Sequence, residues 1–383
     1  MRIAIMTDSY LPTIDGVVTA ILTLTKSLTD LGHTVFIIAP DPGEAHRIEG
    51  VYYFPAIRFK KYPDYFLPIF PSGKRELIES LKPDIIHIEG VAFMGMKALM
   101  VSRATGIPCV STYVTNVVDT LEFYSPIPMP KDLLTKLAWI YIRNFMKRPS
   151  CVIALTDATL TEFKENRVKT KRTAVIPIGI DINRFRTDLD GSEIRKRHGF
   201  TDERIVIHVG RISYEKNIGV AIRSMKYLPD DVKLMVVGKG PALQDMKDLV
   251  KSEGLENKVV FTGFVSDEEL ALYYSASDVV VSASRFETQG LTITEAMACG
   301  LPAACSDGRA FLDVIENGVN GYLFKDTPEE CAEAIMKCLN SLGSMSADAR
   351  RIAEGYSMEA SAKKMVALYE SVVKSKKESI KSL

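Results

Sequence analysis

The feature that most constrains the fold of this chain is an alternation of short apolar runs with amphipathic stretches, which occurs twice along 383 residues. Runs that are short, bounded by polar residues and rich in Val and Ile predict strands buried on both faces. The amphipathic stretches between them predict helices, and strands that alternate with helices form parallel sheets covered on both sides. The sequence therefore predicts an α/β protein with doubly wound parallel sheets.

The predicted strands fall into two sets with a polar, charged stretch between them. The first set is Ile3–Met6, Val35–Ala39, Asp84–Ile88, Cys109–Ser111, Cys151–Ala154 and Ala174–Ile176; the second is Ile205–Val209, Lys233–Val237, Val259–Phe261, Val279–Val281, Ala303–Cys305 and Tyr322–Phe324. Because the chain exceeds one typical core, we expect two Rossmann-like domains, 1–185 and 186–357, with a hinge near 183–202. Such domains bind ligands beyond the carboxyl ends of their strands, and we expect the two to face a cleft.

Composition excludes several classes of function. Lys and Arg together number 48, as do Asp and Glu, so there is no basic field that would attract nucleic acid. The six Cys form no C-x-x-C pair, which favours buried free thiols in a reducing compartment. No apolar run approaches the ~20 residues needed to cross a bilayer. We expect a cytoplasmic protein, with contact at the inner face of the cell membrane left open.

Two carboxylates stand eight positions apart in Glu287-Thr-Gln-Gly-Leu-Thr-Ile-Thr-Glu295. Gly290 frees the backbone to approach a ligand, and a helix starting at Leu291 would direct its first N–H groups at an anion. The two acids could then reach separate parts of one hydroxyl-rich ligand. Alone, however, two Glu near a helix start more often form a solvated first turn that suits the helix dipole.

Two cations follow the first strand of the second set. The strand ends in Gly210-Arg-Ile-Ser-Tyr-Glu-Lys216, which places Arg211 and Lys216 at its carboxyl end. A guanidinium can bind two oxygens of a pyrophosphate while an ammonium acts as a point charge. The alternative is a pair of solvated cations, but cations are unfavourable near a helix N-terminus unless an anion lies between them.

Three shorter patterns narrow the function further. The segment from Thr7 to Thr19 places Gly16 at a helix start, which also suits a phosphate or sugar, but it is not the G-x-G-x-x-G of nicotinamide-dependent dehydrogenases. Gly238-Lys-Gly240 is expected to be a plain tight turn. The D-x-D at Asp188 and Asp190 lies in the polar stretch and is expected to be solvated, so we expect no metal.

Four motifs in the second half resemble the retaining nucleotide-sugar glycosyltransferases of family 4, which have the GT-B fold. The motifs are G-R-I-S-Y-E-K-N (210–217), F-T-G-F-V-S-D-E-E-L (261–270), E-T-Q-G-L-T-I-T-E-A-M-A-C-G-L-P (287–302) and N-G-V-N-G-Y-L-F (317–324). The opening M-T-D-S-Y-L-P-T-I-D-G-V-V-T-A-I (6–21) and the form E-T-Q-G resemble the branch that contains diacylglycerol glucosyl- and sulfoquinovosyl-transferases. The resemblance implies a metal-independent transferase without a cofactor, whose final helix (358–383) packs on the first domain.

The resemblance also implies roles for the matched residues. Arg211 and Lys216 would hold the donor diphosphate, Glu287 would contact the transferred sugar, and these three would be the catalytic residues. Glu295 would bind the ribose hydroxyls. The other implied donor-binding positions are Gly16, Phe264, Val265, Gly290, Leu291 and Thr292, and those on the acceptor side are Asp15, Val114 and His87.

One position departs from the family pattern. Members usually carry a His where this chain has Val114, and a valine can neither donate a hydrogen bond nor move a proton. In retaining enzymes of this kind the donor phosphate is thought to receive the acceptor's proton, so activity can survive at a reduced rate or with another sugar. His87 ends a predicted strand near the cleft, where a lone His is more often structural than catalytic.

Two segments combine aromatic and basic residues in a way that suits a membrane interface. They are Phe59–Phe70 and the predicted helix Leu133–Arg148, in which Trp139, Tyr141 and Phe145 lie among Lys and Arg residues. The alternative is an ordinary loop and a core helix with a basic polar face.

The expected reaction moves a hexose, from UDP-glucose or a related UDP- or GDP-hexose, to a hydroxyl of a membrane lipid or lipid-linked acceptor. The alternatives are a transferase with a soluble sugar acceptor, a GT-B nucleotide-sugar epimerase, and a non-catalytic nucleotide-sugar-binding homologue, which Val114 permits.

Overall fold

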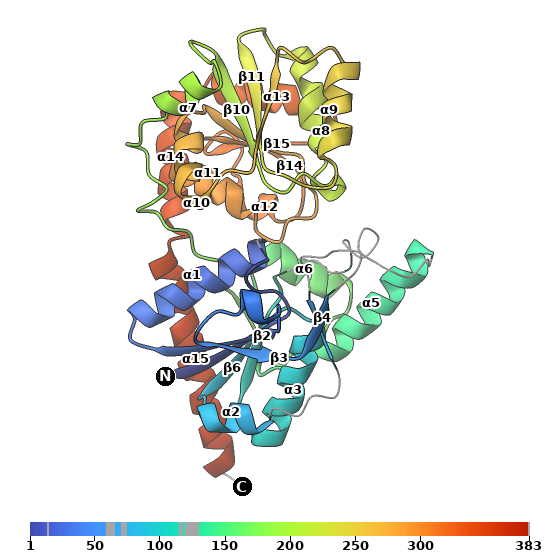
Figure 1. Ribbon diagram of the computed structural model, residues 1–383, viewed down its shortest axis with the longest axis vertical. Helices are drawn as coiled ribbons and strands as arrows, with labels where there is room; N and C mark the ends of the chain where they lie inside the picture. Colours follow the sequence, from blue (N-terminus) through green and yellow to red (C-terminus); the bar gives the residue numbers. More distant parts are fainter. Residues whose placement is uncertain (14, 59–65, 70–74, 115–117, 119–129, 382–383) are drawn as a thin grey trace. The chain divides into compact units, whose positions relative to one another are not determined.

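The computed structural model describes residues 1–13, 15–58, 66–69, 75–114, 118 and 130–381. The chain divides into two compact units, one made of Met1–Gly179 with Met358–Leu383 and the other of Ile180–Ser357 (Figure 1). Each unit contains one large parallel sheet covered by helices, so the predicted fold class is confirmed.

The first unit contains a seven-stranded sheet in the order β3-β2-β1-β6-β7-β8-β9. Its strands are β1 (Arg2–Thr7), β2 (Thr34–Pro40), β3 (Val51–Phe54), β6 (Ile85–Glu89), β7 (Cys109–Thr112), β8 (Cys151–Ala154) and β9 (Thr173–Val175). Its helices include α1 (Gly16–Asp30), α2 (Arg75–Leu81), α3 (Phe93–Thr105), α5 (Lys131–Met146), α6 (Asp157–Glu165) and α15 (Met358–Lys381), and β4 (Ala56–Arg58) pairs with β5 (Phe66–Pro68). The strand order reverses between β1 and β6, which is therefore the switch point of this sheet.

The final helix, α15, belongs to the first unit although it comes last in the sequence. Its side chains Met365, Leu368, Tyr369 and Val372 are buried in one apolar cluster with residues of α1 and of the sheet. Figure 1 shows α15 in red beside α1. The chain thus leaves this unit at Gly179 and returns to it at Met358.

The second unit contains a six-stranded parallel sheet in the order β12-β11-β10-β13-β14-β15. Its strands are β10 (Arg204–Val209), β11 (Val232–Val237), β12 (Val259–Gly263), β13 (Val279–Ser282), β14 (Ala303–Ser306) and β15 (Gly321–Phe324). Its helices include α7 (Ser192–Arg197), α8 (Ile218–Ser224), α9 (Leu243–Ser252), α10 (Asp267–Ser275), α11 (Leu291–Ala298), α12 (Phe311–Val314), α13 (Pro328–Leu339) and α14 (Leu342–Glu354). The order reverses between β10 and β13, which is the switch point here.

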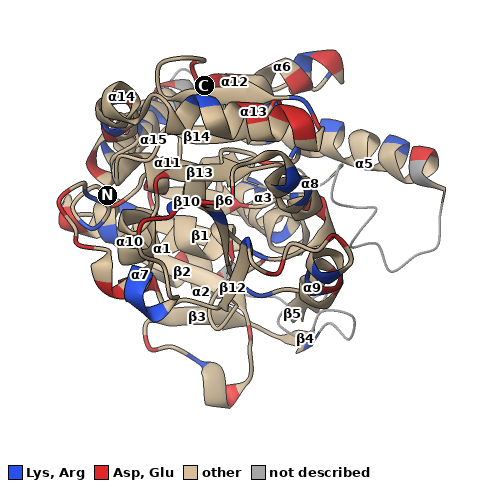
Figure 2. Cartoon of the chain, turned by 90° about the horizontal axis from the view of Figure 1, so that it is seen from above, with Lys and Arg blue, Asp and Glu red and all other residues tan. Residues whose placement is uncertain are grey.

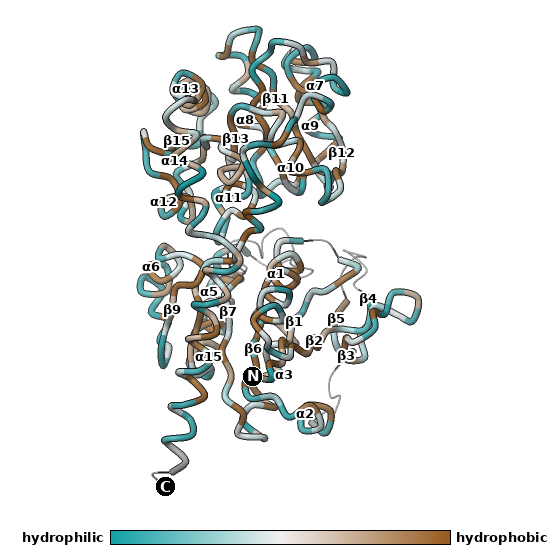
Figure 3. Tube along the Cα trace, turned by 90° about the vertical axis from the view of Figure 1, so that its left-hand side faces the viewer, coloured by the Kyte–Doolittle hydropathy of each residue, from teal (hydrophilic) through white to brown (hydrophobic). Residues whose placement is uncertain are grey.

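The core of the second unit lies on both faces of its sheet, as the continuous apolar strands predicted. Successive residues of β10 point to opposite faces, so Ile205 and Ile207 join one apolar cluster and Val206 joins the other. Figure 3 colours the chain by hydropathy, and brown, hydrophobic segments lie around β11 and β13 inside this unit.

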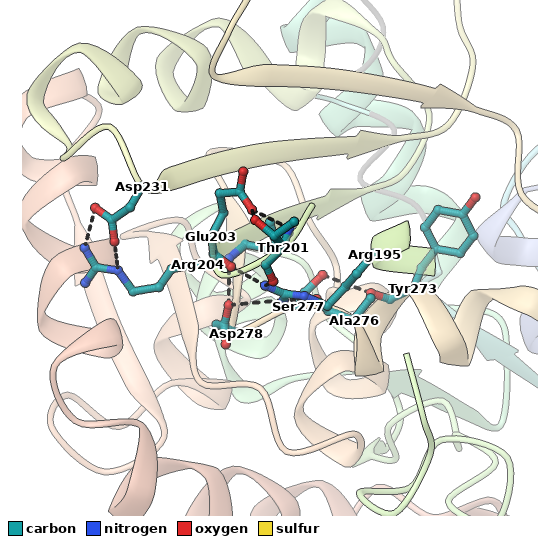
Figure 4. Close-up of polar contacts among 10 residues, drawn as sticks. Arg195, Thr201, Glu203, Arg204, Asp231, Tyr273, Ala276, Ser277 and Asp278 are labelled. Carbon is teal, nitrogen blue, oxygen red and sulfur yellow. Dashed lines mark hydrogen bonds and ion pairs between the residues drawn. The ribbon is translucent and has the colours of Figure 1, made fainter. Parts of the chain in front are cut away.

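The charged stretch expected to be a hinge is instead an integral part of the second unit. Arg195 donates a hydrogen bond to the carbonyl of Ala276 at 2.9 Å (Figure 4). Gly191 lies so close to Ala276 that a Cβ there would come within 2.3 Å of the Ala276 nitrogen. Three apolar residues of the stretch, Phe185, Ile194 and Phe200, are buried in the core. The hinge prediction was wrong because these residues anchor a segment whose average composition is polar.

Candidate functional site

The three residues implied to be catalytic converge at the switch point of the second sheet. Arg211 and Lys216 lie in the loop after β10, and Glu287 lies in the loop after β13, the neighbouring strand. Lys216 Nζ donates to Glu287 Oε1 at 2.5 Å. Because the carboxyl ends of adjacent parallel strands meet at one edge of the sheet, residues 71 positions apart form one ion pair.

The Lys216–Glu287 pair is charged and reachable from solvent. The side chains are 28% and 20% exposed, respectively. Burial alone would raise the pKa of Glu287, but the Lys216 ammonium lowers it below its ordinary value. A partly exposed ammonium held by one carboxylate can also bind an arriving anion, and the carboxylate can accept hydrogen bonds from hydroxyl groups.

A histidine that the motif analysis missed lies next to this pair. His208 is 3% exposed, and its Nδ1 lies 3.2 Å from the carbonyl of Val281 on β13. Its pKa falls to about 4, chiefly because of burial, while the Lys216 ammonium lowers it and the Glu287 carboxylate raises it. One sequence feature could have revealed it: His208 interrupts the apolar run 205–209, two residues before Gly210.

The start of α11 supplies backbone donors at the same edge of the sheet. Gly290 precedes the helix with φ at 83°, and a Cβ there would come within 2.5 Å of a ring carbon of Phe311. Only glycine fits this turn. The helix has no side-chain cap and no acidic residue in its first turn, so the backbone N–H groups of Leu291 and Thr292 can bind an anion.

Glu295 lies inside α11 and is almost completely buried. Its side chain is 9% exposed, and the hydroxyl of the buried Tyr274 donates to its Oε2 at 3.3 Å. Burial raises the pKa of Glu295 to about 7. The carboxyl group is therefore fixed in orientation and can both donate and accept hydrogen bonds near neutral pH.

The two residues predicted to lie by the nucleobase, Phe264 and Val265, differ in their exposure to solvent. Phe264, directly after β12, is 53% exposed and presents a ring that could stack on a base. Val265 packs against the apolar core of the unit.

The turn Gly238-Lys-Gly240 is more than the plain tight turn that we expected. A Cβ on Gly238 would come within 1.9 Å of the Gly210 carbonyl oxygen, and one on Gly240 within 2.1 Å of that of Ile212. The two glycines therefore allow this turn to pack against the backbone of the loop that carries Arg211 and Lys216.

In the first unit, Asp15 and Gly16 form the start of α1. Asp15 caps the helix by accepting from the Val18 N–H at 2.9 Å, and it also accepts from the Ser9 hydroxyl. Gly16 is exposed, and a Cβ there would meet no atom of the described residues within 4 Å. Open space at a helix start is compatible with close approach of a ligand.

His87 lies inside the first unit and has partners on both ring nitrogens. Nδ1 lies 2.6 Å from the Tyr369 hydroxyl and Nε2 lies 2.6 Å from Thr112 Oγ1, and the side chain is fully buried. Glu89 Oε1 lies 3.1 Å from Nε2. Burial lowers the pKa of His87 to about 3 and raises that of Glu89 to about 8, so both are uncharged at neutral pH. This placement gives no support to an acceptor-side role for His87.

Val114 is 8% exposed and lines a cavity of about 20 Å³. Glu89 and Thr112 line the same cavity, together with residues of α1 and α15. Thr115 and Asn116, which follow Val114, lie outside the described residues. The position where the family carries a His therefore borders the buried His87–Glu89 cluster.

The two carboxylates of the D-x-D pattern interact with residues close to them in the sequence. Asp188 is largely exposed and pairs with Arg186, while Asp190 accepts from the Ser192 N–H. Within the described part of the chain, no three His, Cys, Asp or Glu residues gather as metal ligands would. All six cysteines are buried free thiols, as predicted.

Family models match nearly the whole chain. Residues 14–184 match the model described as Glycosyltransferase Family 4, and residues 190–356 match Glycosyl transferases group 1. The chain belongs to the family 4 glycosyltransferases. Two curated relatives are alpha-monoglucosyldiacylglycerol synthases: that of Streptococcus pneumoniae is 31% identical, with 88% of this chain and 78% of the relative covered, and that of Acholeplasma laidlawii is 30% identical, with 96% of each covered.

Solved structures show the same fold. The crystal structure of Anabaena Alr3699/HepE in complex with UDP matches with a TM-score of 0.78 at 23% identity, covering 97% of this chain and 100% of that one. Sucrose-phosphate synthase from Thermosynechococcus elongatus also has a TM-score of 0.78, at 21% identity, with 98% and 99% covered. This family 4 glycosyltransferase therefore has the predicted GT-B fold.

Proposed function

We propose that this glycosyltransferase transfers a hexosyl group, with retention of configuration, from a nucleoside diphosphate sugar to a hydroxyl group of a membrane lipid. The observation that carries the donor half of the proposal is the cluster at the second switch point. There Arg211, Lys216 and the first N–H groups of α11 offer positive charge and hydrogen-bond donors, while Glu287 and Glu295 offer acceptors for hydroxyl groups. A diphosphate flanked by two sugars has this pattern of charge and hydroxyls.

Each group in the cluster then has a defined task. Arg211 and Lys216 bind the diphosphate, assisted by the backbone of Gly290, Leu291 and Thr292. Glu287 accepts hydrogen bonds from the transferred sugar, and Glu295, oriented by Tyr274, binds the ribose hydroxyls. Phe264 and Val265 lie by the base. In the first unit, Gly16 allows close approach of the ligand, and Asp15 and Val114 belong to the acceptor side.

The reaction requires stabilisation of negative charge, and these positive groups can supply it. When the bond between the sugar carbon and the diphosphate oxygen breaks, negative charge gathers on the departing nucleoside diphosphate. Preorganised cations and helix N–H groups stabilise that charge without reorganisation. The acceptor oxygen forms the new bond on the same face, and its proton passes to the departing phosphate oxygen. Because the departing phosphate accepts the proton, the reaction needs no protein side chain as a base. Val114 is therefore compatible with turnover.

The donor is proposed to be UDP-glucose. The names of the pneumococcal and Acholeplasma relatives indicate glucosyl transfer, and the Anabaena neighbour is a complex with UDP. GDP-mannose is the second candidate, because GDP-mannose-dependent alpha-mannosyltransferases, such as that of Mycolicibacterium smegmatis at 28% identity, are also relatives. A direct comparison of the two donors decides between them.

A lipid acceptor is supported by relatives and by the surface of α5. The relatives include the two monoglucosyldiacylglycerol synthases and the Arabidopsis thaliana sulfoquinovosyl transferase, at 29% identity. On α5, Leu133, Leu137 and Ile140 are 46%, 46% and 42% exposed, and their spacing puts them on one stripe of the helix. Lys136 on α5 and the two residues that directly follow the helix, Lys147 and Arg148, are exposed cations. Figure 2 shows blue segments for Lys and Arg along α5.

The surface of α5 that we propose to contact the membrane is not the one that its aromatic residues suggested. Trp139 and Phe145 are buried in the core of the first unit, and Tyr141 donates its hydroxyl to the Val91 carbonyl. Trp139 and Phe145 lie on the inner side of α5 because they are spaced at helical intervals with other core residues, whereas Tyr141 is 37% exposed. In the other segment only 66–69 lie within the described residues; 59–65 and 70 do not. We propose that the leucine–isoleucine stripe of α5 enters the headgroup region while its cations meet anionic lipids.

A membrane contact of this kind is peripheral. Among the described residues, no helix combines the length and the hydropathy that a bilayer span requires. Substituting Leu137→Ser and Ile140→Ser should reduce co-sedimentation with vesicles, whereas the same change at exposed Leu312 in the second unit should not.

The test of the proposed function is a donor and acceptor panel. The protein is incubated with UDP-glucose or GDP-mannose and with vesicles that contain diacylglycerol, and nucleotide release and product mass are recorded. We expect a glycosylated lipid from one donor, and Arg211→Ala and Glu287→Ala should abolish it. Transfer to a soluble sugar alone would contradict the lipid acceptor. Conversion of the donor without any acceptor would indicate an epimerase, and binding without transfer or hydrolysis a non-catalytic homologue.

A further inference from the structure

His208 is a polar group for which the proposed reaction has no assigned task. It occupies a strand position whose neighbours, Val206 on its own strand and Val236 and Val281 on adjacent strands, are apolar and buried. Its Nε2 is buried and has no hydrogen-bond partner among the residues that the structure describes. An unsatisfied nitrogen in an apolar core destabilises the fold, and a valine would avoid this cost. The imidazole therefore suggests a function.

The hydrogen bonding of the ring defines which nitrogen is available. Because the Val281 carbonyl can only accept, Nδ1 must carry the proton of the neutral ring and donate it. The free lone pair is then on Nε2. This atom lies on the side of Gly210, where an added Cβ would be 4.0 Å away, and Gly210 begins the loop that carries Arg211 and Lys216.

The charges around His208 keep it neutral while the site is empty of ligand. The two charged groups that act on it are the Lys216 ammonium, from the loop after β10, and the Glu287 carboxylate, from the loop after β13. Their effects on the pKa of His208 oppose each other, and burial has the largest effect. A bound diphosphate would add negative charge beside Lys216, and added negative charge favours the protonated form of a nearby imidazole.

We propose that His208 takes up one proton when the donor diphosphate binds beside Lys216, and that the resulting imidazolium stabilises the diphosphate as the sugar leaves. The proton comes from solvent and adds to Nε2, and it returns to solvent when the nucleoside diphosphate dissociates. The transfer reaction itself neither consumes nor produces this proton. His208 is a positioning residue in this scheme, because it acts on the diphosphate through the loop 210–216. The inference rests on the proposed donor site.

Calorimetry with UDP-glucose, and with GDP-mannose in parallel, tests the proton uptake. The diphosphate of a nucleotide sugar is esterified at both ends and does not titrate near neutral pH, unlike that of free UDP. Because binding takes up a proton, we expect affinity to rise at least about threefold from pH 7.5 to pH 5.5, with an upper limit of about tenfold per pH unit. At pH 6, the binding heat should depend on the buffer's ionisation enthalpy.

Two variants separate His208 from other groups in the site that titrate, including Glu295. His208→Asn retains a donor for the Val281 carbonyl but cannot take up a proton. It should flatten the pH dependence and remove most of the proton uptake. His198→Asn is the matched control, since His198 is a half-buried histidine of the same unit that contacts the Tyr273 hydroxyl. It should behave like the wild-type protein.

Imidazole NMR tests the same point by following the titration of His208 in the wild-type protein. The chain has five histidines, so the His208 signal can be assigned by its loss in His208→Asn. We expect it to titrate at a higher pH when UDP-glucose is bound. An unchanged titration, or equal proton uptake in wild-type and His208→Asn proteins, would overturn the inference while leaving the donor site intact. If neither nucleotide sugar binds, the proposed function fails and this inference fails with it.

Discussion

The two sheets carry ionisable residues at the same topological position, the switch point, but surround them differently. In the first unit, His87 and Glu89 on β6 are enclosed, and α15 covers them with Tyr369. In the second unit, Lys216 and Glu287 lie in loops beyond the strands and remain partly exposed. The first cluster is uncharged at neutral pH because burial suppresses ionisation, whereas the second persists as an ion pair.

The difference in burial between the two clusters shows that the switch point of a sheet can stabilise the fold in one unit and bind a ligand in the other. An enclosed polar group with hydrogen-bond partners stabilises the fold and has little affinity left for a ligand. A charged pair at the surface contributes little stability but offers strong interactions to a ligand of opposite charge. Changes in the first cluster should therefore alter stability, and changes in the second should alter catalysis.

The largest expected effect comes from removing the cation of the second cluster. Lys216→Ala should lower the rate of sugar transfer about 10²–10³-fold, because one preorganised group that stabilises developing negative charge typically contributes that much. Stability should change little. The exposed Lys247 of α9 provides the control, and Lys247→Ala should transfer sugar at the wild-type rate. Equal rates for Lys216→Ala and Lys247→Ala would contradict the assignment of the donor site.

The converse change in the first cluster should affect stability. Tyr369→Phe leaves His87 Nδ1 without its partner and should reduce the free energy of unfolding of the first unit by about 1–3 kcal/mol. The single Trp of the chain, Trp139, is buried in this unit, so its fluorescence reports the unfolding of the first unit. Tyr214→Phe, which removes an exposed hydroxyl in the second unit, should leave this transition unchanged. A normal transition in Tyr369→Phe would show that the cluster is not structural.

The free energy of unfolding should depend on pH through the ionisation of Glu89. Its pKa is raised from 4.5 to about 8, so the folded state holds a proton that the unfolded state releases. This stabilisation is fully present below pH 4.5 and is lost as the pH rises towards 8. From pH 6.5 to 8, wild-type stability should fall relative to Glu89→Gln by on the order of 1 kcal/mol per pH unit. Parallel curves would contradict the raised pKa. His87 contributes only below this range, because its pKa is lowered from 6.5.

The smallest expected effect concerns the residue that departs from the family pattern. Val114→His should raise the turnover about two- to tenfold, since one added hydrogen bond contributes ~0.5–1.5 kcal/mol. Glu89 lines the same cavity and could orient the new imidazole. Val114→Leu fills space without adding a donor and serves as the control. Equal rates in the His and Leu variants would show that the lost imidazole is not what limits activity.

The sequence predicted the parts of the fold that follow from local pattern. Each run of buried Val and Ile proved to be a strand because such runs must be covered on both faces. The motif around Gly290 correctly indicated a turn and helix start, since its φ of 83° suits glycine. β3 was missed because Val51-Tyr-Tyr-Phe54 is short and aromatic, and it is defined by pairing with β2.

Long-range packing accounts for what the sequence did not reveal. Phe185, Ile194 and Phe200 are scattered in a charged segment, so only the folded unit shows that they share a core. The contact between Lys216 and Glu287 depends on β10 and β13 being neighbours. The cluster of His87 with Tyr369 joins residues 282 positions apart and requires α15 to return to the first unit.

The central claim is that the switch point of the second sheet binds the donor diphosphate, and a crystal structure of the protein with UDP tests it most directly. The account predicts diphosphate oxygens within hydrogen-bond distance of Arg211, Lys216 and the backbone N–H of Leu291. UDP bound at another place, with Lys216 still paired only to Glu287, would contradict it.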